Sequence, residues 1–312
     1  MMMKVLLTGG AGYIGSVLTG RLLARGMDVA VVDKLIYRQT SLLQYFDNPR
    51  FSFVNGDVRD ERLMRDLVRD RDVILPLAAI VGAPACARDP ESSTSINLHA
   101  VAMLAKISSA GQAVIYPTTN SGYGTTSGEE FCTEETPLAP ISLYGRDKVE
   151  AERILLERGN AVTLRFATVF GVSPRMRLDL LVNDFTFRAV RDRFLVIFEK
   201  QFKRNFLHVL DAADCFVFCI EQFAQMKGEP YNVGLNEANI SKEELALAIK
   251  RRVPELYIHF AEVGSDPDKR NYVVSNDKIN RKGFVASHGL DEGIRQLIRA
   301  YAMIGKSEMY NC

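Results

Sequence analysis

The most constraining feature of the sequence is a glycine-rich segment, residues 8–15 (TGGAGYIG), which lies between a short apolar run and a stretch of helical periodicity. A strand that leads into a helix through such a loop is typical of dinucleotide-binding folds. Gly9 allows the tight turn, Gly12 lets the backbone approach a pyrophosphate, and Gly15 lets the helix pack on the sheet. The helix N-terminus adds N–H donors and a positive dipole end. The segment therefore predicts a phosphate cradle, although a glycine-rich turn that binds nothing is the alternative.

Apolar runs rich in β-branched residues alternate with helical segments through the first half of the chain. The predicted strands cover residues 4–8, 29–33, 51–56, 72–79, 113–119 and 161–166. The predicted helices cover residues 13–25, 61–69, 96–110 and 144–158. Alternation of this kind indicates parallel strands joined by right-handed crossovers. We therefore predict an α/β fold with a doubly wound parallel sheet.

The alternation weakens after about residue 171, where turn residues recur, for example at 228–230 and 264–268. Residues 1–170 are expected to form a dinucleotide-binding domain. Residues 171–312 are expected to form mainly a smaller C-terminal lobe for the substrate. Residues 210–222 have the periodicity of a helix, so a segment of about 205–235 is expected to return to the first domain.

Composition excludes several classes of protein. The 312 residues carry 39 Lys and Arg against 38 Asp and Glu, a net charge of +1, which indicates no partner that is a nucleic acid or an anionic membrane. An apolar run of about 18 residues is also absent from the sequence, so we expect no signal peptide, no membrane span and a cytoplasmic location.

The five cysteines are odd in number and scattered, at Cys86, Cys132, Cys215, Cys219 and Cys312. Cys215 and Cys219 lie one helical turn apart in an apolar run, which favours buried packing over a metal or redox pair. Because histidines at metal-ligand spacing do not accompany them, we expect no metal site.

Asp33 ends the second predicted strand, about 20 residues beyond the glycine segment, where a carboxylate can bind the adenosine ribose. A carboxylate there would repel a 2′-phosphate, which favours NAD over NADP. Lys34 beside it weakens this preference.

Tyr144 and Lys148 stand at positions i and i+4 of a predicted helix, so they share one face. Oxidation of an alcohol requires a base, and an adjacent ammonium is expected to lower the pKa of a phenol toward neutral pH. Such a pair is often only surface decoration. Here the polar segment 116–124 ends a predicted strand, the edge at which open α/β sheets bind ligands.

With these residues the sequence resembles the extended short-chain dehydrogenase/reductase family, in particular its nucleotide-sugar epimerases and dehydratases, over nearly the whole chain. The matching positions are residues 8–15, Asp33, residues 56–58, residues 77–79, Asn97, residues 123–124, Tyr144, Lys148 and residues 204–209. The resemblance implies a Rossmann fold with tightly bound NAD and a nucleotide-sugar substrate.

The resemblance also implies roles for single residues. Tyr144 would be the acid/base, Lys148 its partner and Thr119 a hydrogen-bond partner of the sugar, although the Thr119 hydroxyl could instead satisfy strand-end backbone. The implied cofactor contacts are Gly9, Gly12, Tyr13, Ile14, Gly15, Asp33, Lys34, Asp57, Val58, Leu77, Ala78, Ala79, Asn97, Tyr144 and Lys148. The implied substrate contacts are Thr119, Asn120, Ser121, Thr168, Arg175, Arg177, Asn183, Arg204 and Arg270.

Departures from the family pattern limit the reactions that the chain is expected to catalyse. The 4,6-dehydratases carry Asp-Glu after the catalytic Thr, whereas Asn120 and Ser121 stand here, which disfavours dehydration. The remaining reaction is oxidation at C4. It would be catalysed either by a dehydrogenase that releases a keto-sugar or by a 4-epimerase that retains NAD. Thr168 stands where relatives usually have an Asn that contacts the nucleotide diphosphate, and Ile80 stands where many have a polar residue.

Residues 173–185, together with 118–124 and 266–272, look similar to a subgroup that includes bacterial GDP-manno-heptose 4-dehydrogenases of capsule biosynthesis. This resemblance implies oxidation of GDP-D-glycero-D-manno-heptose to its 4-keto form, with a 2-oxo acid as reoxidant. The helices at 96–110 and 144–158 correspond to those that form a homodimer in many relatives. A non-catalytic NAD sensor and a reductase of a small carbonyl compound are the more remote alternatives.

Overall fold

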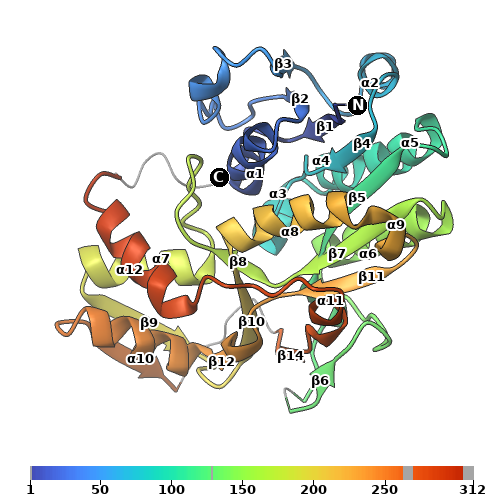
Figure 1. Cartoon of the computed structure of the whole chain (residues 1–312). Helices are drawn as coiled ribbons and strands as arrows, with labels where there is room; N and C mark the ends of the chain where they lie inside the picture. Colours follow the sequence, from blue (N-terminus) through green and yellow to red (C-terminus); the bar gives the residue numbers. More distant parts are fainter. Residues whose placement is uncertain (1, 128, 263–269, 305–312) are drawn as a thin grey trace.

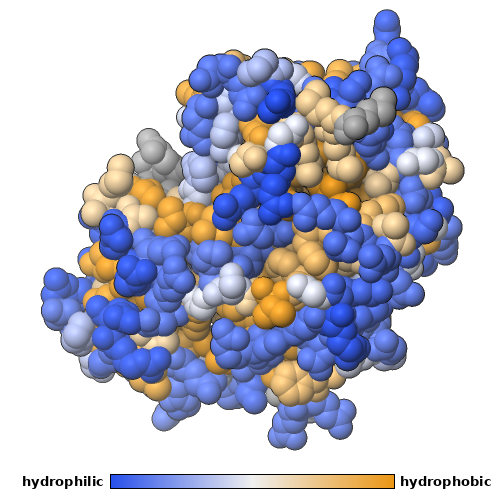
Figure 2. Space-filling model, in the orientation of Figure 1, coloured by the Kyte–Doolittle hydropathy of each residue, from blue (hydrophilic) through white to orange (hydrophobic). Residues whose placement is uncertain are grey.

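The fold is described from a computed structural model, in which residues 2–127, 129–262 and 270–304 are described. The predicted turn at 264–268, residues 266–269 of the substrate segment and Cys312 lie outside these ranges. Hydrophilic residues cover most of the face shown in Figure 2, with apolar residues in smaller groups between them.

A seven-stranded parallel sheet forms the centre of the larger part of the molecule (Figure 1). Its strand order is β11-β7-β5-β4-β1-β2-β3. The strands are β1 (Lys4–Thr8), β2 (Asp28–Asp33), β3 (Phe51–Asn55), β4 (Val73–Pro76), β5 (Ala113–Thr119), β7 (Ala161–Phe166) and β11 (Pro230–Val233). Since every pair in this sheet is parallel, the predicted doubly wound sheet is confirmed.

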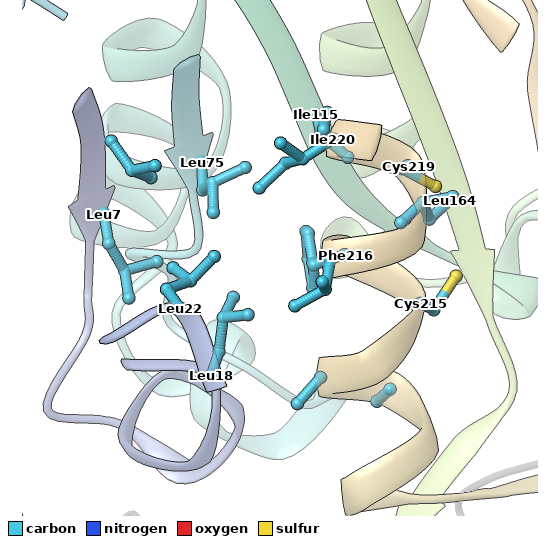
Figure 3. Packing of buried hydrophobic residues seen from close by; sticks show 14 of the residues in the cluster. Leu7, Leu18, Leu22, Leu75, Ile115, Leu164, Cys215, Phe216, Cys219 and Ile220 are labelled. Carbon is cyan, nitrogen blue, oxygen red and sulfur yellow. The ribbon is translucent and has the colours of Figure 1, made fainter. Parts of the chain in front are cut away.

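Helices cover both faces of this sheet. On one face, α1 (Tyr13–Ala24) and α8 (Val209–Glu221) pack into a single apolar cluster. Figure 3 shows Leu18 and Leu22 of α1 pointing toward strand residues and Phe216 of α8. Cys215 and Cys219 are buried in the same cluster, as the apolar spacing predicted. On the other face lie α2 (Glu61–Val68), α5 (Ala100–Ile107) and α6 (Leu143–Glu157).

The second lobe, at the lower left of Figure 1, has its own apolar core. It contains a sheet of β8 (Thr168–Phe170), β10 (Lys203–His208) and β12 (Asn239–Ser241), and a pair of β9 (Phe194–Phe198) and β13 (Tyr257–Ala261). Its helices are α7 (Leu181–Arg191), α10 (Lys242–Arg252) and α12 (Leu290–Ala300).

Several short elements complete the described chain. They are α3 (Ala83–Arg88), α4 (Pro90–Thr94), a π-helical turn (Ser95–His99), α9 (Phe223–Met226), α11 (Asp277–Arg281), and a bridge of β6 (Phe131–Cys132) with β14 (Val273–Val274). Short 3-10 turns lie at Leu43–Tyr45, Asn120–Tyr123 and Asn236–Ala238. Across the described ranges, no helix has both the length and the apolar character needed to cross a membrane.

The sequence prediction missed β11. The sequence predicts a turn at residues 228–230, but the chain enters the sheet at Pro230 and pairs with β7. A four-residue strand that begins with proline has little strand signal of its own, because it is an edge strand defined by its long-range pairing. The helix predicted at 210–222 is α8, and it lies with β11 on the large sheet.

Candidate active site

A cavity of about 950 Å³ lies where the carboxyl ends of the central strands meet the second lobe. Thr119 ends β5, Asp33 ends β2 and Gly9 directly follows β1, and all three line the cavity. Crevices at this edge are where open α/β sheets bind ligands. Arg204 of β10 and Lys242 of α10 line the opposite side.

The glycine segment leaves room for a pyrophosphate. Gly9 has φ +68°, and a Cβ there would lie 2.6 Å from the Ala78 Cα. A Cβ on Gly15 would lie 2.6 Å from the Gly10 Cα, whereas one on Gly12 would meet only the Gly9 carbonyl oxygen at 3.1 Å. Gly12 caps α1 without a capping side chain from the described residues, and the first turn of α1 lines the cavity, where its N–H groups can serve as donors to a ligand. This geometry fits a dinucleotide.

Asp33 both lines the cavity and holds the glycine segment. Its carboxylate accepts hydrogen bonds from the Ala11 N–H at 3.0 Å and the Leu35 N–H at 2.8 Å. Burial raises the pKa of Asp33. Lys34 pairs with Asp57 at 2.8 Å, and Asp57 also bonds Arg59, whose hydrogen bond holds the pKa of that carboxyl well below its usual range.

The remaining cofactor candidates divide into two groups. Those that line the cavity are Tyr13, Ile14, Val58, Leu77, Ala78 and Ala79. Asn97 does not: it is 1% exposed, and its amide bonds both the N–H and the carbonyl of Ile80 at 2.9 Å. The structure thus corrects the predicted cofactor contact, because the Asn97 amide holds the backbone behind the cavity wall.

Thr119, Tyr144 and Lys148 all line the cavity. Tyr144 lies in the first turn of α6, and Lys148 follows one turn later on the same face. The Lys148 Nζ is buried 3.9 Å from the centroid of the Tyr116 ring. The Thr119 hydroxyl bonds the Ser121 hydroxyl at 2.9 Å, so it also satisfies local groups at the strand end.

The pKa directions at this pair differ from the sequence prediction. Burial raises the pKa of Tyr144 to about 12 and lowers that of Lys148 to about 7. An adjacent ammonium was expected to lower the phenol pKa. That expectation is wrong for this structure, because removal from water disfavours both charged forms. Burial therefore favours the protonated form of Tyr144.

The substrate candidates also divide by position. Those that line the cavity are Thr119, Ser121, Thr168, Arg175, Arg177, Arg204 and Arg270. Asn183 is fully buried on α7, where its amide bonds the Gly171 N–H at 3.0 Å and the Arg177 carbonyl at 2.9 Å. Asn120 is 1% exposed and lies off the lining. Both predicted substrate contacts are corrected, since these side chains point into the protein.

Arginines from distant segments form the second-lobe side of the cavity. Arg177 is paired with Asp179, with 3.0 Å between Nε and Oδ1, and the Arg175 guanidinium lies 5.1 Å from the centroid of the Tyr37 ring. Arg270 donates to the Ser121 hydroxyl, next to Thr119. The sequence prediction missed Tyr37, Arg188, Lys242 and Tyr272, which also line the cavity. Tyr37, Arg188 and Lys242 lie outside the motifs, Tyr272 ends the segment 266–272, and only folding brings the four residues together.

Within the described ranges, no cluster of His, Cys, Asp and Glu side chains could hold a metal ion. Thr118 Oγ1 is buried at the cavity and has no hydrogen-bond partner among the described residues. This polar atom is consistent with an organic ligand beside β5.

Comparisons with known proteins identify the family to which the chain is similar. Residues 5–234 match the model of the NAD dependent epimerase/dehydratase family. The chain is 30% identical over 310 residues to the low-salt glycan biosynthesis protein Agl12 of Haloferax volcanii, covering 96% of this chain and 98% of that protein. It is 27% identical to UDP-glucuronic acid decarboxylase 1 of Arabidopsis thaliana, covering 95% and 69%. The structure superposes on UDP-glucose 4-epimerase of Thermotoga maritima with a TM-score of 0.85 at 24% identity, covering 96% and 99%.

Proposed function

Because the chain belongs to the NAD-dependent epimerase/dehydratase family and is an NAD-dependent enzyme of nucleotide-sugar type, we propose that it oxidises a nucleotide-linked sugar at C4. The observation that carries the proposal is one shared cavity. It brings the glycine segment together with Thr119, Tyr144 and Lys148 on one side and with Arg175, Arg177, Arg204 and Arg270 on the other.

Bound NAD supplies the acceptor for the hydride that leaves the sugar carbon. Tyr144 takes or returns the hydroxyl proton, and Thr119 holds the sugar oxygen through its hydroxyl. Lys148 is one helical turn away and favours the phenolate when it is charged. The arginines bind the diphosphate through charge-assisted hydrogen bonds. Asp33 accepts from the cofactor ribose, which favours NAD over NADP.

The residues after Thr119 support oxidation without dehydration. Elimination of water from a sugar requires a second acid and base. Neither an amide nor a hydroxyl is a carboxylic acid, and Asn120 also lies off the cavity lining.

The proposed substrate is GDP-D-glycero-D-manno-heptose, which becomes its 4-keto form in the synthesis of a bacterial capsule or surface polysaccharide. The support is the resemblance of residues 173–185, whose Arg175 and Arg177 line the cavity. A 2-oxo acid as reoxidant, a homodimer and a cytoplasmic location belong to the same proposal.

A nucleotide-sugar 4-epimerase is the second candidate, and the family description, which includes epimerases, supports it. Both candidates share the first oxidation. They differ in whether the hydride returns to the opposite face of the same sugar or the keto-sugar leaves.

The test is turnover on a panel of nucleotide sugars. GDP-D-glycero-D-manno-heptose, GDP-mannose, UDP-glucose and UDP-glucuronic acid would be incubated with the protein, and NADH absorbance and sugar NMR recorded. A 4-keto product with accumulated NADH supports the dehydrogenase, and a 4-epimer with retained NAD supports the epimerase. NAD and nucleotide binding without turnover of any C4-hydroxyl sugar would contradict both and favour a sensor.

A further inference from the structure

Two loops that are far apart in the sequence are locked together behind the cavity. One is the cradle at the start of α1. The other is the arginine loop, residues 171–180, which joins β8 to α7 and carries Arg175 and Arg177. The hydrogen-bond network that joins them consists of four side chains, each at most 6% exposed: Tyr13, Ser16, Ser173 and Asn183.

Tyr13 is the centre of this hydrogen-bond network. Its hydroxyl donates to the Gly171 carbonyl at 2.7 Å and accepts from the Asn183 amide at 3.3 Å. Burial raises the pKa of Tyr13 well above its usual range, so the hydroxyl keeps its proton. The Tyr13 carbonyl accepts from the Ser173 hydroxyl at 2.7 Å, and that hydroxyl lies 3.1 Å from the Ser16 hydroxyl.

The same network holds both ends of the arginine loop. Asn183 accepts from the Gly171 N–H at 3.0 Å and donates to the Arg177 carbonyl at 2.9 Å. The Arg175 N–H lies 3.3 Å from the Ser173 hydroxyl that it donates to. The Arg175 backbone is therefore bonded to Ser173, and the Arg177 backbone to Asn183. Both of these side chains are also bonded to Tyr13.

Separating the cradle from the arginine loop would leave buried polar groups without hydrogen-bond partners, which costs free energy. The two loops therefore move together. Gly12, Tyr13 and Ile14 line the cavity at the cradle, and Arg175 and Arg177 line it from the arginine loop. A ligand that fixes one loop therefore restricts the other, and such coupling between sites is reciprocal.

We propose that Tyr13, Ser16, Ser173 and Asn183 form a positioning latch that couples occupation of the cofactor cradle to the placement of Arg175 and Arg177. The sequence had assigned Tyr13 to the cofactor and Asn183 to the substrate. In the latch, neither side chain needs to touch a ligand, because each acts through the loop that it holds. Only the identification of the arginine loop with the substrate rests on the proposed function.

The direct test is hydrogen exchange of the arginine-loop amides, recorded with and without saturating NAD after removal of copurified cofactor. NAD is expected to slow exchange at residues 171–180 by about tenfold in the wild-type protein, a coupling of ordinary size. In Tyr13→Phe, which keeps the ring but lacks the hydroxyl, and in Ser173→Ala, the slowing should fall below about threefold.

Thr186→Val is the matched control. Its hydroxyl is buried on α7 and donates to the Val182 carbonyl at 2.7 Å, outside the latch. This variant should keep the wild-type response to NAD. Equal loss of the response in Thr186→Val would show general loosening and overturn the latch, as would a full response in Tyr13→Phe or no response in the wild type.

A second readout separates the latch from the proposed function. The dissociation constant of GDP, measured by calorimetry, should be about tenfold lower with NAD than without it, and this ratio should approach one in Tyr13→Phe. If the wild type binds NAD but not GDP or UDP, the assigned substrate site fails. The exchange experiment still decides the latch, because it requires only NAD.

Discussion

The two sides of the cavity are built by different means. The cofactor side is lined largely by glycines and small apolar residues that follow adjacent strands, and Gly9 and Gly15 leave no space for a side chain. The substrate side consists of long cationic side chains from separate segments, including Arg175 and Arg270. Backbone recognises a constant ligand through its shape, whereas side chains can change one at a time. Under the proposed function, cofactor binding therefore depends on the shape of the backbone, and substrate binding depends on individual side chains.

Tyr144 lies where the two sides meet, and its removal should have the largest effect on turnover. Tyr144→Phe is expected to lower kcat by about 100- to 10,000-fold, the usual contribution of a general acid or base. The dissociation constants of NAD and nucleotide should be unchanged, since the ring remains. Steady-state kinetics and calorimetry on one preparation would measure both, and full turnover would refute the assigned role.

A side chain in the cradle should damage the cofactor side directly. Gly9→Val forces a Cβ toward the Ala78 backbone, and the positive φ adds strain of about 1–3 kcal/mol. NAD affinity is expected to fall at least about 100-fold.

Gly159→Ala provides the control for the cradle variant. Gly159 also has a positive φ, +83°, but its Cβ would meet no described atom within 4 Å. This variant should lose some stability and keep its NAD affinity, as calorimetry and thermal melts would show. Equal loss of NAD affinity in both variants would mean that the cradle geometry is not responsible.

Removal of one arginine should affect only the substrate side. Arg270→Ala is expected to raise KM for the nucleotide sugar about 10- to 100-fold, because hydrogen bonds to charged groups contribute about 1.5–3 kcal/mol. Arg153→Ala removes an exposed arginine of α6 that is paired with Glu150 and Glu157, and it should leave KM unchanged. A change in NAD affinity of Arg270→Ala, with unchanged KM, would contradict the division of the cavity.

The smallest expected effect concerns pH. Oxidation requires Tyr144 as phenolate and Lys148 as ammonium. With a pKa of about 12 for Tyr144 and about 7 for Lys148, the fraction in this state rises with pH and levels off above about pH 7. The rate should rise about fivefold from about pH 6 to about pH 7 and then change little. Lys148→Met should remove this break, and a break that persists in Lys148→Met would exclude Lys148 as its source.

The same division explains what the sequence could predict. The strands and helices of the first half follow one another locally, so periodicity and the glycine segment were sufficient to predict six of the seven strands and the cradle. The seventh strand, β11, depends on pairing with β7, which no local pattern contains.

The candidate site was less accessible to sequence reasoning. Asn120 and Asn183 belong to the segments 118–124 and 173–185, which resemble substrate-binding segments of the family. In the fold their side chains are buried in the protein. Lys242 and Tyr37 carry no motif and reach the cavity only through tertiary packing. The pKa of Tyr144 was predicted in the wrong direction because spacing along a helix says nothing about how much water surrounds the pair.

The most direct test of the central claim follows the hydride itself. GDP-D-glycero-D-manno-heptose deuterated at C4 would be mixed with an excess of NAD-loaded protein, and the cofactor released after one turnover would be analysed by mass spectrometry. Oxidation at C4 with release of the keto-sugar predicts NADH that carries the deuterium, and a 4-epimerase predicts the deuterium at C4 of the epimerised sugar. A cofactor without deuterium, with the label still on the unchanged substrate or lost to water, would contradict oxidation at C4 of this substrate.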